Sequence, residues 1–257
     1  DVDGDGKLDV VQADSAGLVH AWKITSSGPV ELPGFPFKGK KLDGVDGKDK
    51  PTSYLKAKAY QPGAIDPEIA REAFFATVAV ADVDGDKKVE IAATSYGGTI
   101  HLLANDGTEK PGWPVSLPYV PSCPLDPTVP RPEICMDPAN LVVKGALGSP
   151  VLIDMNKDGK LDVVQAGFDG KIYVFAHDGT PMPGWPVALH YDGRLAKAKE
   201  HNRILTTPAV ADLNGDGIPE ILTGSNEKLG EDGGSGAFYV IDGRGRNAPG
   251  TDAAHVG

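Results

Sequence analysis

Four short acidic loops hold the residues of this sequence whose types and spacing best suit a chemical role. Each loop has oxygen-bearing side chains at its first, third, fifth and ninth positions, and its seventh residue would contribute a backbone carbonyl. The loops are Asp1, Asp3, Asp5, Lys7 and Asp9; Asp82, Asp84, Asp86, Lys88 and Glu90; Asp154, Asn156, Asp158, Lys160 and Asp162; and Asp212, Asn214, Asp216, Ile218 and Glu220. Oxygen ligands alone, at alternating positions, suit a hard cation of variable coordination number, Ca²⁺ ahead of Mg²⁺. We therefore expect up to four bound calcium ions.

The fourth and sixth positions of these loops are mostly glycine, which allows the positive φ angles of a tightly wrapped loop. Two lysines depart from this pattern, Lys87 at the sixth position of the second loop and Lys157 at the fourth position of the third. We expect these two loops to be more strained or to bind metal more weakly.

Two other interpretations of the loops have to be weighed. An EF-hand needs a glutamate at position 12 and flanking helices. Position 12 instead holds Gln12, Ala93, Gln165 and Thr223, and the flanking residues are typical of strands. The other alternative is a set of Asp-Gly turns without metal. One such loop would leave that choice open, whereas four aligned loops favour calcium.

The charge of the chain supports a cation and excludes some partners. The 36 acidic residues outnumber the 25 lysines and arginines, which gives a net charge of −11. Carboxylates clustered in a loop repel one another without metal, so folding stability should depend on calcium. The acidic balance argues against nucleic acid and anionic membrane surfaces as partners. No apolar run is long enough to span a bilayer.

The acidic loops recur within a longer repeat, which indicates the fold. A glycine and an apolar run follow each loop. Three copies have an Asp-Gly turn next, at residues 106–107, 178–179 and 242–243. A Pro-Gly-aromatic-Pro element ends the unit at residues 33–36, 111–114 and 183–186. Each unit contains four short β-branched or apolar runs, which is the size of a propeller blade.

We therefore predict an all-β fold, a β-propeller segment of about four four-stranded blades that forms a single domain over residues 1–257. Trp113 and Trp185 occupy equivalent positions and should pack between blades. The only helix expected is at residues 67–74. The predicted units are residues 1–37, 75–117, 147–189 and 205–250, and the insertions between them are residues 38–73, 118–145 and 190–204. The insertions should leave each blade on the same side, where loops on a rigid scaffold commonly bind partners.

The loop pattern between two strands resembles the FG-GAP repeat of integrin α-subunit propellers. Bacterial VCBS-type relatives, with Asp-Gly-Thr and Pro-Gly-Trp-Pro elements, look closer still. No Phe-Gly precedes the small-residue-Pro element, which here is Gly148–Pro150 and Thr206–Pro208. The resemblance implies a six- to eight-bladed propeller that the rest of a longer chain would complete. It also implies a secreted, periplasmic or cell-surface protein.

The two cysteines, Cys123 and Cys135, lie in the proline-rich second insertion. A disulfide that closes this loop is the favoured interpretation and fits an oxidising compartment. A zinc site is disfavoured because no histidine lies nearby to complete four ligands. Two free thiols remain an alternative.

Histidines offer weak catalytic candidates. His20 and His101 share a repeat position with Tyr173 and Tyr239, which favours a half-buried blade surface over a site. A second group, in the third insertion, could hold an acidic glycan, although a solvated loop is favoured; it consists of His190, Tyr191, Arg194, His201 and Arg203. No nucleophile elbow, zinc-protease or phosphate-binding motif occurs, so we assign no catalytic residue.

Two function classes remain. The first is a calcium-binding propeller module that presents its insertions to a protein or glycan partner, as in adhesion. The second is a calcium-dependent polysaccharide lyase, which would need basic and aromatic side chains converging near a metal loop to abstract a proton. The binding module is favoured, because only residues 190–203 offer such a cluster.

Overall fold

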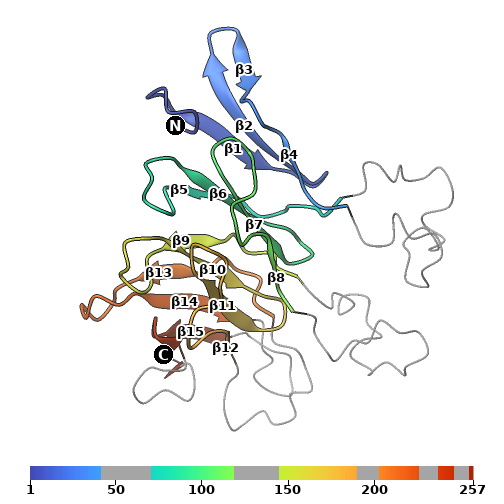
Figure 1. Ribbon diagram of the computed structural model, residues 1–257. Coiled ribbons are helices and arrows are strands. Elements are labelled where there is room, and N and C mark those ends of the chain that lie inside the picture. Colours follow the sequence, from blue (N-terminus) through green and yellow to red (C-terminus); the bar gives the residue numbers. More distant parts are fainter. Residues whose placement is uncertain (42–70, 119–144, 190–202, 226–236, 246–254, 257) are drawn as a thin grey trace, which may run out of the picture.

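The computed structural model describes residues 1–41, 71–118, 145–189, 203–225, 237–245 and 255–256, and this part of the chain consists of strands and connecting loops without a helix (Figure 1). The strands form four antiparallel sheets. In the described residues no helix is long and apolar enough to cross a membrane.

Each sheet is built from strands that follow one another along the chain. The first contains β1 (Asp9–Ala13), β2 (Leu18–Thr25), β3 (Gly28–Glu31) and β4 (Phe37–Lys38); the second β5 (Ala79–Ala81), β6 (Glu90–Thr94), β7 (Thr99–Leu103) and β8 (Val115–Ser116); the third β9 (Val151–Ile153), β10 (Asp162–Ala166), β11 (Lys171–Phe175) and β12 (Val187–Ala188); the fourth β13 (Ala209–Ala211), β14 (Glu220–Ser225), β15 (Ala237–Ile241) and β16 (His255–Val256). The last three sheets are simple four-stranded meanders. Blades of four strands are therefore confirmed.

The first sheet departs from this pattern. Its acidic loop precedes β1, and β2 is long enough to pair with β3 along one half and with β4 along the other. The fourth sheet closes later than predicted, because β16 lies beyond residue 250. The predicted helix at residues 67–74 is wrong where it can be checked. Arg71 forms a β-bridge with Lys41, and the backbone N–H of Glu72 donates to the Lys40 carbonyl at 2.9 Å.

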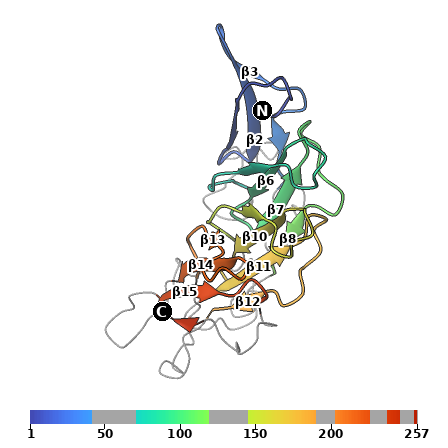
Figure 2. The same ribbon diagram turned by 90° about the vertical axis from the view of Figure 1, so that its left-hand side faces the viewer.

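The four blades follow one another in a row, with the two ends of the chain at opposite ends of the array (Figures 1 and 2). Apolar side chains fill the space between neighbouring blades. Trp113 of the second blade packs with Val163 and Phe175 of the third, and Trp185 of the third packs with Ile221 and Ile241 of the fourth. The prediction that both tryptophans pack between blades is confirmed.

Glycines bring the backbones of neighbouring blades into contact at this interface. A Cβ on Gly112 would lie 1.9 Å from the Asp178 carbonyl oxygen of the next blade, and one on Gly179 would lie 2.5 Å from the Gly112 oxygen. The Trp113 indole N–H donates to the His177 carbonyl at 3.0 Å beside this contact. In the fourth blade the equivalent turn glycine is Gly245, which faces the Gly184 oxygen. The expected turn at residues 242–243 is therefore displaced by two residues.

Candidate metal centres

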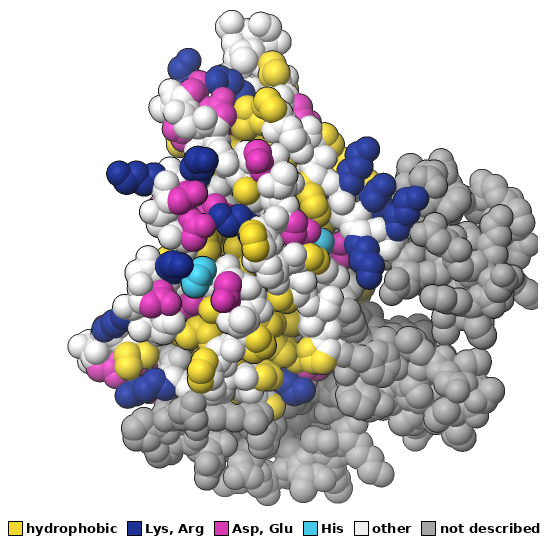
Figure 3. All heavy atoms as spheres, viewed as in Figure 1, with side chains coloured by type: hydrophobic (Ala, Val, Ile, Leu, Met, Phe, Trp, Pro, Cys, Tyr) yellow, Lys and Arg dark blue, Asp and Glu magenta, His cyan; other side chains and the backbone are white. Residues whose placement is uncertain are grey.

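The acidic loops share one edge of the array, where acidic side chains gather with lysines and arginines among them (Figure 3). In the second, third and fourth blades each loop connects the first strand to the second. Since every blade repeats this connection, neighbouring loops come to lie at the same edge.

All four loops are folded by the same hydrogen bonds between side chain and backbone. The first-position carboxylate accepts from the backbone N–H of position 6 at 2.8–3.0 Å. The ninth-position carboxylate accepts from the N–H of position 2 at 2.7–2.9 Å. The fifth-position carboxylate accepts from the N–H of position 7 at 2.8–2.9 Å. The shared hydrogen bonds therefore give all four loops the same local fold.

The backbone of the loops is left-handed at positions 4 and 6 in every case. Glycine occupies most of these positions, but Lys87 has φ of 70° and Lys157 has φ of 62°. A side chain in this conformation costs roughly 1–2 kcal/mol. The strain expected in the second and third loops is therefore present. Weaker metal binding by these loops stays a prediction.

The carboxylates of the first two loops are close enough to share one cation. Oxygens of Asp1, Asp3 and Asp5 lie within 4.8 Å of one another, and so do those of Asp82, Asp84 and Asp86. The third and fourth loops replace the middle carboxylate by the amides of Asn156 and Asn214. Side-chain oxygens at this separation form a ligand set of the type that Ca²⁺ prefers.

The ninth position distinguishes the loops. Asp162 is fully buried, its Oδ2 accepts from the Met155 N–H, and its Oδ1 has no hydrogen-bond partner. Burial, reinforced by Asp158 and Asp154, raises the pKa of Asp162 to about 6. The Oδ1 of Asp9 is also buried and unpaired. A buried carboxylate oxygen without a partner is unfavourable unless a cation or donor satisfies it.

The longer glutamates in the other two loops reach partners. Glu90 Oε1 accepts from the Lys110 ammonium at 3.2 Å, and Glu220 Oε1 accepts from the Asn214 amide at 3.0 Å. In the two loops with a ninth-position glutamate, the second carboxylate oxygen is therefore satisfied within the protein.

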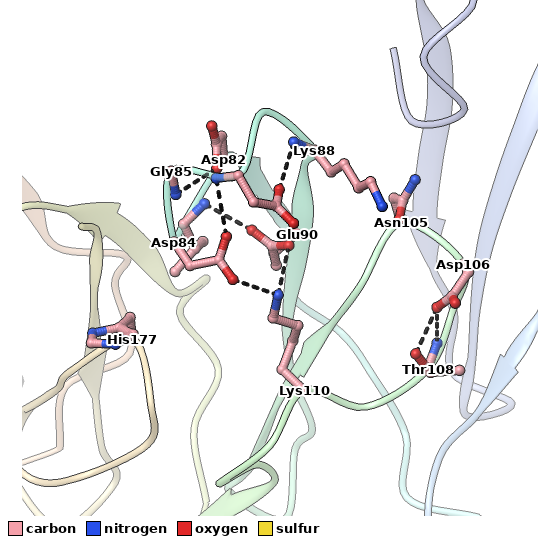
Figure 4. Close-up of polar contacts among 12 residues, drawn as sticks. Asp82, Asp84, Gly85, Lys88, Glu90, Asn105, Asp106, Thr108, Lys110 and His177 are labelled. Atoms are coloured by element: carbon pink, nitrogen blue, oxygen red, sulfur yellow. Dashed lines mark hydrogen bonds and ion pairs between the residues drawn. The ribbon is translucent and has the colours of Figure 1, made fainter. Parts of the chain in front are cut away.

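Three of the loops also carry a cationic side chain on their carboxylates. Lys23 contacts Asp3 at 2.9 Å and also Asp5, and Lys110 contacts Asp84 at 2.7 Å (Figure 4). Arg244 contacts Asp216 at 3.3 Å. Burial by itself would lower the pKa of Lys110, but its hydrogen bonds to Asp84 and Glu90 outweigh burial and raise it.

The third loop has no such partner among the described residues. No lysine or arginine nitrogen of that part of the chain lies within 4.0 Å of the carboxylates of Asp154, Asp158 or Asp162. The cationic partners were not found by sequence analysis. Each is contributed from outside the loop motif, and none recurs at the same position of another blade.

The shared histidine and tyrosine position is more buried than predicted in three blades, whereas His20 of the first blade is half-buried as predicted. The side chain of His101 is 2% exposed and bridges Glu109 at 3.0 Å and Glu72 at 2.8 Å. The Tyr173 hydroxyl donates to Asp169 at 2.5 Å, and Tyr239 is fully buried. His20 stacks on Trp22 and contacts Glu31 at 3.1 Å. Burial and these contacts within or beside each blade agree with a structural role.

Several candidates from the sequence lie outside the described residues. They are Cys123, Cys135, His190, Tyr191, Arg194 and His201. The disulfide and the glycan-binding cluster therefore stay predictions. Arg203, the remaining member of that cluster, is described and lies beside Ile204 at the start of the fourth repeat.

Comparisons with known proteins agree with the repeat and the fold. Residues 154–223 match the family model of the FG-GAP-like repeat, which confirms the predicted repeat family for the third blade and part of the fourth. A search among curated proteins finds no match.

Solved structures of low sequence identity resemble this chain. BBS1N in complex with ARL6DN, soaked with lead, gives a TM-score of 0.51 at 13% identity over 94% of this chain and 52% of that chain. The mercury-soaked complex gives 0.51 at 12% identity, over 93% of this chain and 51% of that chain. The Pseudomonas aeruginosa PilY1 C-terminal domain gives a TM-score of 0.47 at 14% identity, over 91% of this chain and 38% of that chain. The chain therefore spans about half the length of the BBS1N chain that it matches, and the BBS1N similarity supports a β-propeller fold.

Proposed function

We propose that this array of FG-GAP-type blades is a calcium-binding scaffold of an exported or cell-surface protein, which presents its insertions to a protein or glycan partner. The observation that carries the calcium proposal is the environment of the Asp162 carboxylate. Its Oδ1 is buried, unpaired and held in a loop with two further carboxylates. The third loop would hold the ion with Asp154, Asn156, Asp158, Asp162 and the Lys160 carbonyl. A bound Ca²⁺ would supply positive charge that neutralises these carboxylates.

Metal-free Asp-Gly turns account for part of the geometry only. The hydrogen bonds to the backbone N–H groups would form in such a turn as well. They leave the Oδ1 of Asp162 and of Asp9 without a partner. A hard cation satisfies such an oxygen. All the side-chain ligands that the loop offers are oxygens, which favours calcium.

The ends of the insertions support this proposal, because they lie at equivalent turns of neighbouring blades. The chain enters the second insertion after Leu117, whose N–H donates to the Gly98 carbonyl at 2.7 Å. It returns at Ala146, whose N–H donates to the Tyr96 carbonyl at 3.3 Å. The third insertion begins and ends at the equivalent turn. The Leu189 N–H donates to the Gly170 carbonyl, and the Ile204 N–H donates to the Gly167 carbonyl. This turn connects the second and third strands, at the opposite end of the blade from the acidic loop.

The protein or glycan partner is proposed from the position of the insertion ends and from the propeller fold. The similar BBS1N propeller was solved in complex with ARL6DN, so a protein partner is in keeping with the architecture. An exported location fits calcium sites of moderate affinity, because extracellular calcium modules work at about 10⁻⁴–10⁻³ M. No observation among the described residues favours the lyase alternative, whose candidate cluster lies mostly outside them.

Thermal unfolding in calcium and in excess chelator tests the proposal. A site whose dissociation constant lies a hundredfold below the calcium concentration adds about 2.7 kcal/mol to the free energy of unfolding. We expect a higher unfolding midpoint in calcium, and a smaller change in equimolar magnesium. Equal midpoints in calcium and in chelator would contradict the calcium proposal and leave the metal-free turn as the explanation of the loops.

We also infer that further blades of the same kind cover both end faces of the array. At the tenth repeat position, Ile91, Val163 and Ile221 are fully buried against the preceding blade, whereas Val10 is 45% exposed. Val10 is therefore an interface residue of the first blade that no preceding blade covers among the described residues.

The fourth blade has the complementary feature at the other end. Val19, Ile100 and Ile172 are fully buried, whereas the equivalent Phe238 is 52% exposed. Leu213 is 56% exposed, although its counterpart Met155 is buried. Both faces match the interfaces between the four blades, so a blade of the same repeat is the occupant that their chemistry favours.

Binding of a hydrophobic dye tests these faces. The 257-residue chain should bind the dye, and Val10→Glu with Phe238→Glu should remove most of the signal. The unfolding midpoint should barely move, because both side chains are already exposed. Leu147→Glu, at a 38% exposed position of the third blade, which has a neighbour on each side, is the control. If the double variant and the control reduce dye binding equally, the end faces are not the exposed interfaces.

A further inference from the structure

We propose that one side chain, at residue 110 in the second blade and residue 182 in the third, sets the calcium affinity of its blade's acidic loop. Lys110 would act as a tethered competing cation that weakens the second loop, and Met182 would leave the third loop free to bind more tightly. This inference rests on the proposed calcium function and adds an order of occupancy among the loops.

Lys110 lies on the oxygens that calcium would use. Its ammonium is 2.7 Å from Asp84 Oδ2 and 3.2 Å from Glu90 Oε1, which belong to the third and ninth positions of the loop (Figure 4). Glu90 is 1% exposed, and the Lys110 side chain is 20% exposed. The pair is therefore shielded from most of the solvent, where charge interactions are less strongly screened.

Met182 occupies the same place in the next blade. Its backbone N–H donates to the Val174 carbonyl at 2.9 Å, as the Lys110 N–H donates to Leu102 at 2.9 Å. Both residues stand three positions before the interface tryptophan of their blade. The Met182 side chain packs against the apolar cluster between the third and fourth blades and brings no charge. In that blade the ninth-position Asp162 keeps an unpaired buried oxygen.

The two loops would therefore differ in what their carboxylates contact before calcium binds. In the second loop the ion has to displace an ammonium that already neutralises two ligands, and the displaced charge stays nearby on its side chain. In the third loop the ligands have no such cation to lose. An unfavourable charge contact of this kind, partly screened by solvent, should weaken binding about tenfold.

Calcium titration followed by amide NMR can measure each loop separately. The Gly85 N–H donates to Asp82 at 2.8 Å, and the Gly159 N–H donates to Asp154 at 2.9 Å. Each glycine amide therefore reports the first ligand of its own loop. In the wild-type protein we expect Gly159 to respond at lower calcium concentrations than Gly85.

Two reciprocal variants test the assignment. Lys110→Met should tighten the response of Gly85 about tenfold and leave Gly159 unchanged, and Met182→Lys should weaken Gly159 alone. Lys87→Met is the control. It removes the same charge from an exposed side chain of the second loop that makes no ion pair within the described residues.

The outcomes separate this inference from the function on which it rests. If neither glycine responds to calcium, the proposed function fails and the inference fails with it. If both respond but Lys110→Met leaves Gly85 unchanged, or Lys87→Met tightens it equally, calcium binding stands and the role of residue 110 is overturned. Should one variant fail to fold, the other still decides the question.

Discussion

Asp162→Asn is expected to be more stable than the wild-type protein in chelator and less stable in calcium. Without metal, the wild-type protein buries an ionised carboxylate whose Oδ1 has no partner. Its pKa is raised to about 6, first by burial and then by Asp158 and Asp154. An ionised group whose folded pKa is raised by this amount destabilises the folded state by about 2–3 kcal/mol at neutral pH. Asparagine keeps the acceptor for the Met155 N–H and removes the charge.

In calcium the order should reverse, because asparagine supplies a weaker ligand than a carboxylate. The variant would then lose much of the roughly 2.7 kcal/mol that a saturated site contributes. Urea unfolding of both proteins at pH 7.4, in millimolar calcium and in chelator, measures the crossing directly.

Glu90→Gln provides the contrast at the equivalent position of the second loop. Its Oε1 already accepts from Lys110 at 3.2 Å, so removal of its charge relieves nothing and should destabilise the protein in chelator. If Asp162→Asn were less stable than the wild-type protein under both conditions, the unpaired oxygen would not be the feature that calls for a cation.

The repeat made the blades and the loops predictable from sequence. Asp1, Asp82, Asp154 and Asp212 begin loops of identical spacing, and a short β-branched or apolar strand follows each of them. Because the loops are folded by bonds between residues at most seven positions apart, local sequence was sufficient to predict where their acidic side chains lie. The same reasoning placed Trp113 and Trp185 between blades, where an aromatic side chain fills the gap next to a proline.

Interactions between distant elements could not be read from the same pattern. Lys110 meets Glu90 across 20 positions, and His101 meets Glu72 across 29 positions through the end of an insertion. Among the described residues each occurs in one blade only, so the repeat gives no second copy to reveal it. The displaced turn at Gly245 shows the opposite error. There the motif Asp242–Gly243 repeats in sequence, but the contact with the preceding blade falls two residues later.

Gly112→Ala should be among the most destabilising single substitutions in the chain. A Cβ at this position would lie 1.9 Å from the Asp178 carbonyl oxygen and 2.9 Å from its carbon, in a residue with φ of 87°. The obstructing atoms are backbone of the next blade, which cannot rotate away as a side chain could. The two blades would have to separate, exposing the apolar surface around Trp113 and Phe175. We expect a loss of about 4 kcal/mol or more.

Gly85→Ala separates the packing cost from the backbone cost. Gly85 has φ of 81°, close to that of Gly112, but a Cβ there would meet no atom within 4 Å. Its loss should be limited to the roughly 1–2 kcal/mol of a left-handed alanine. Urea midpoints for both variants, compared in calcium, give the difference. Equal midpoints would mean that neighbouring blades can move apart at the glycine contact at little cost in stability. A large difference would show that backbone contact between blades fixes their spacing, and with it the spacing of the insertions that they present.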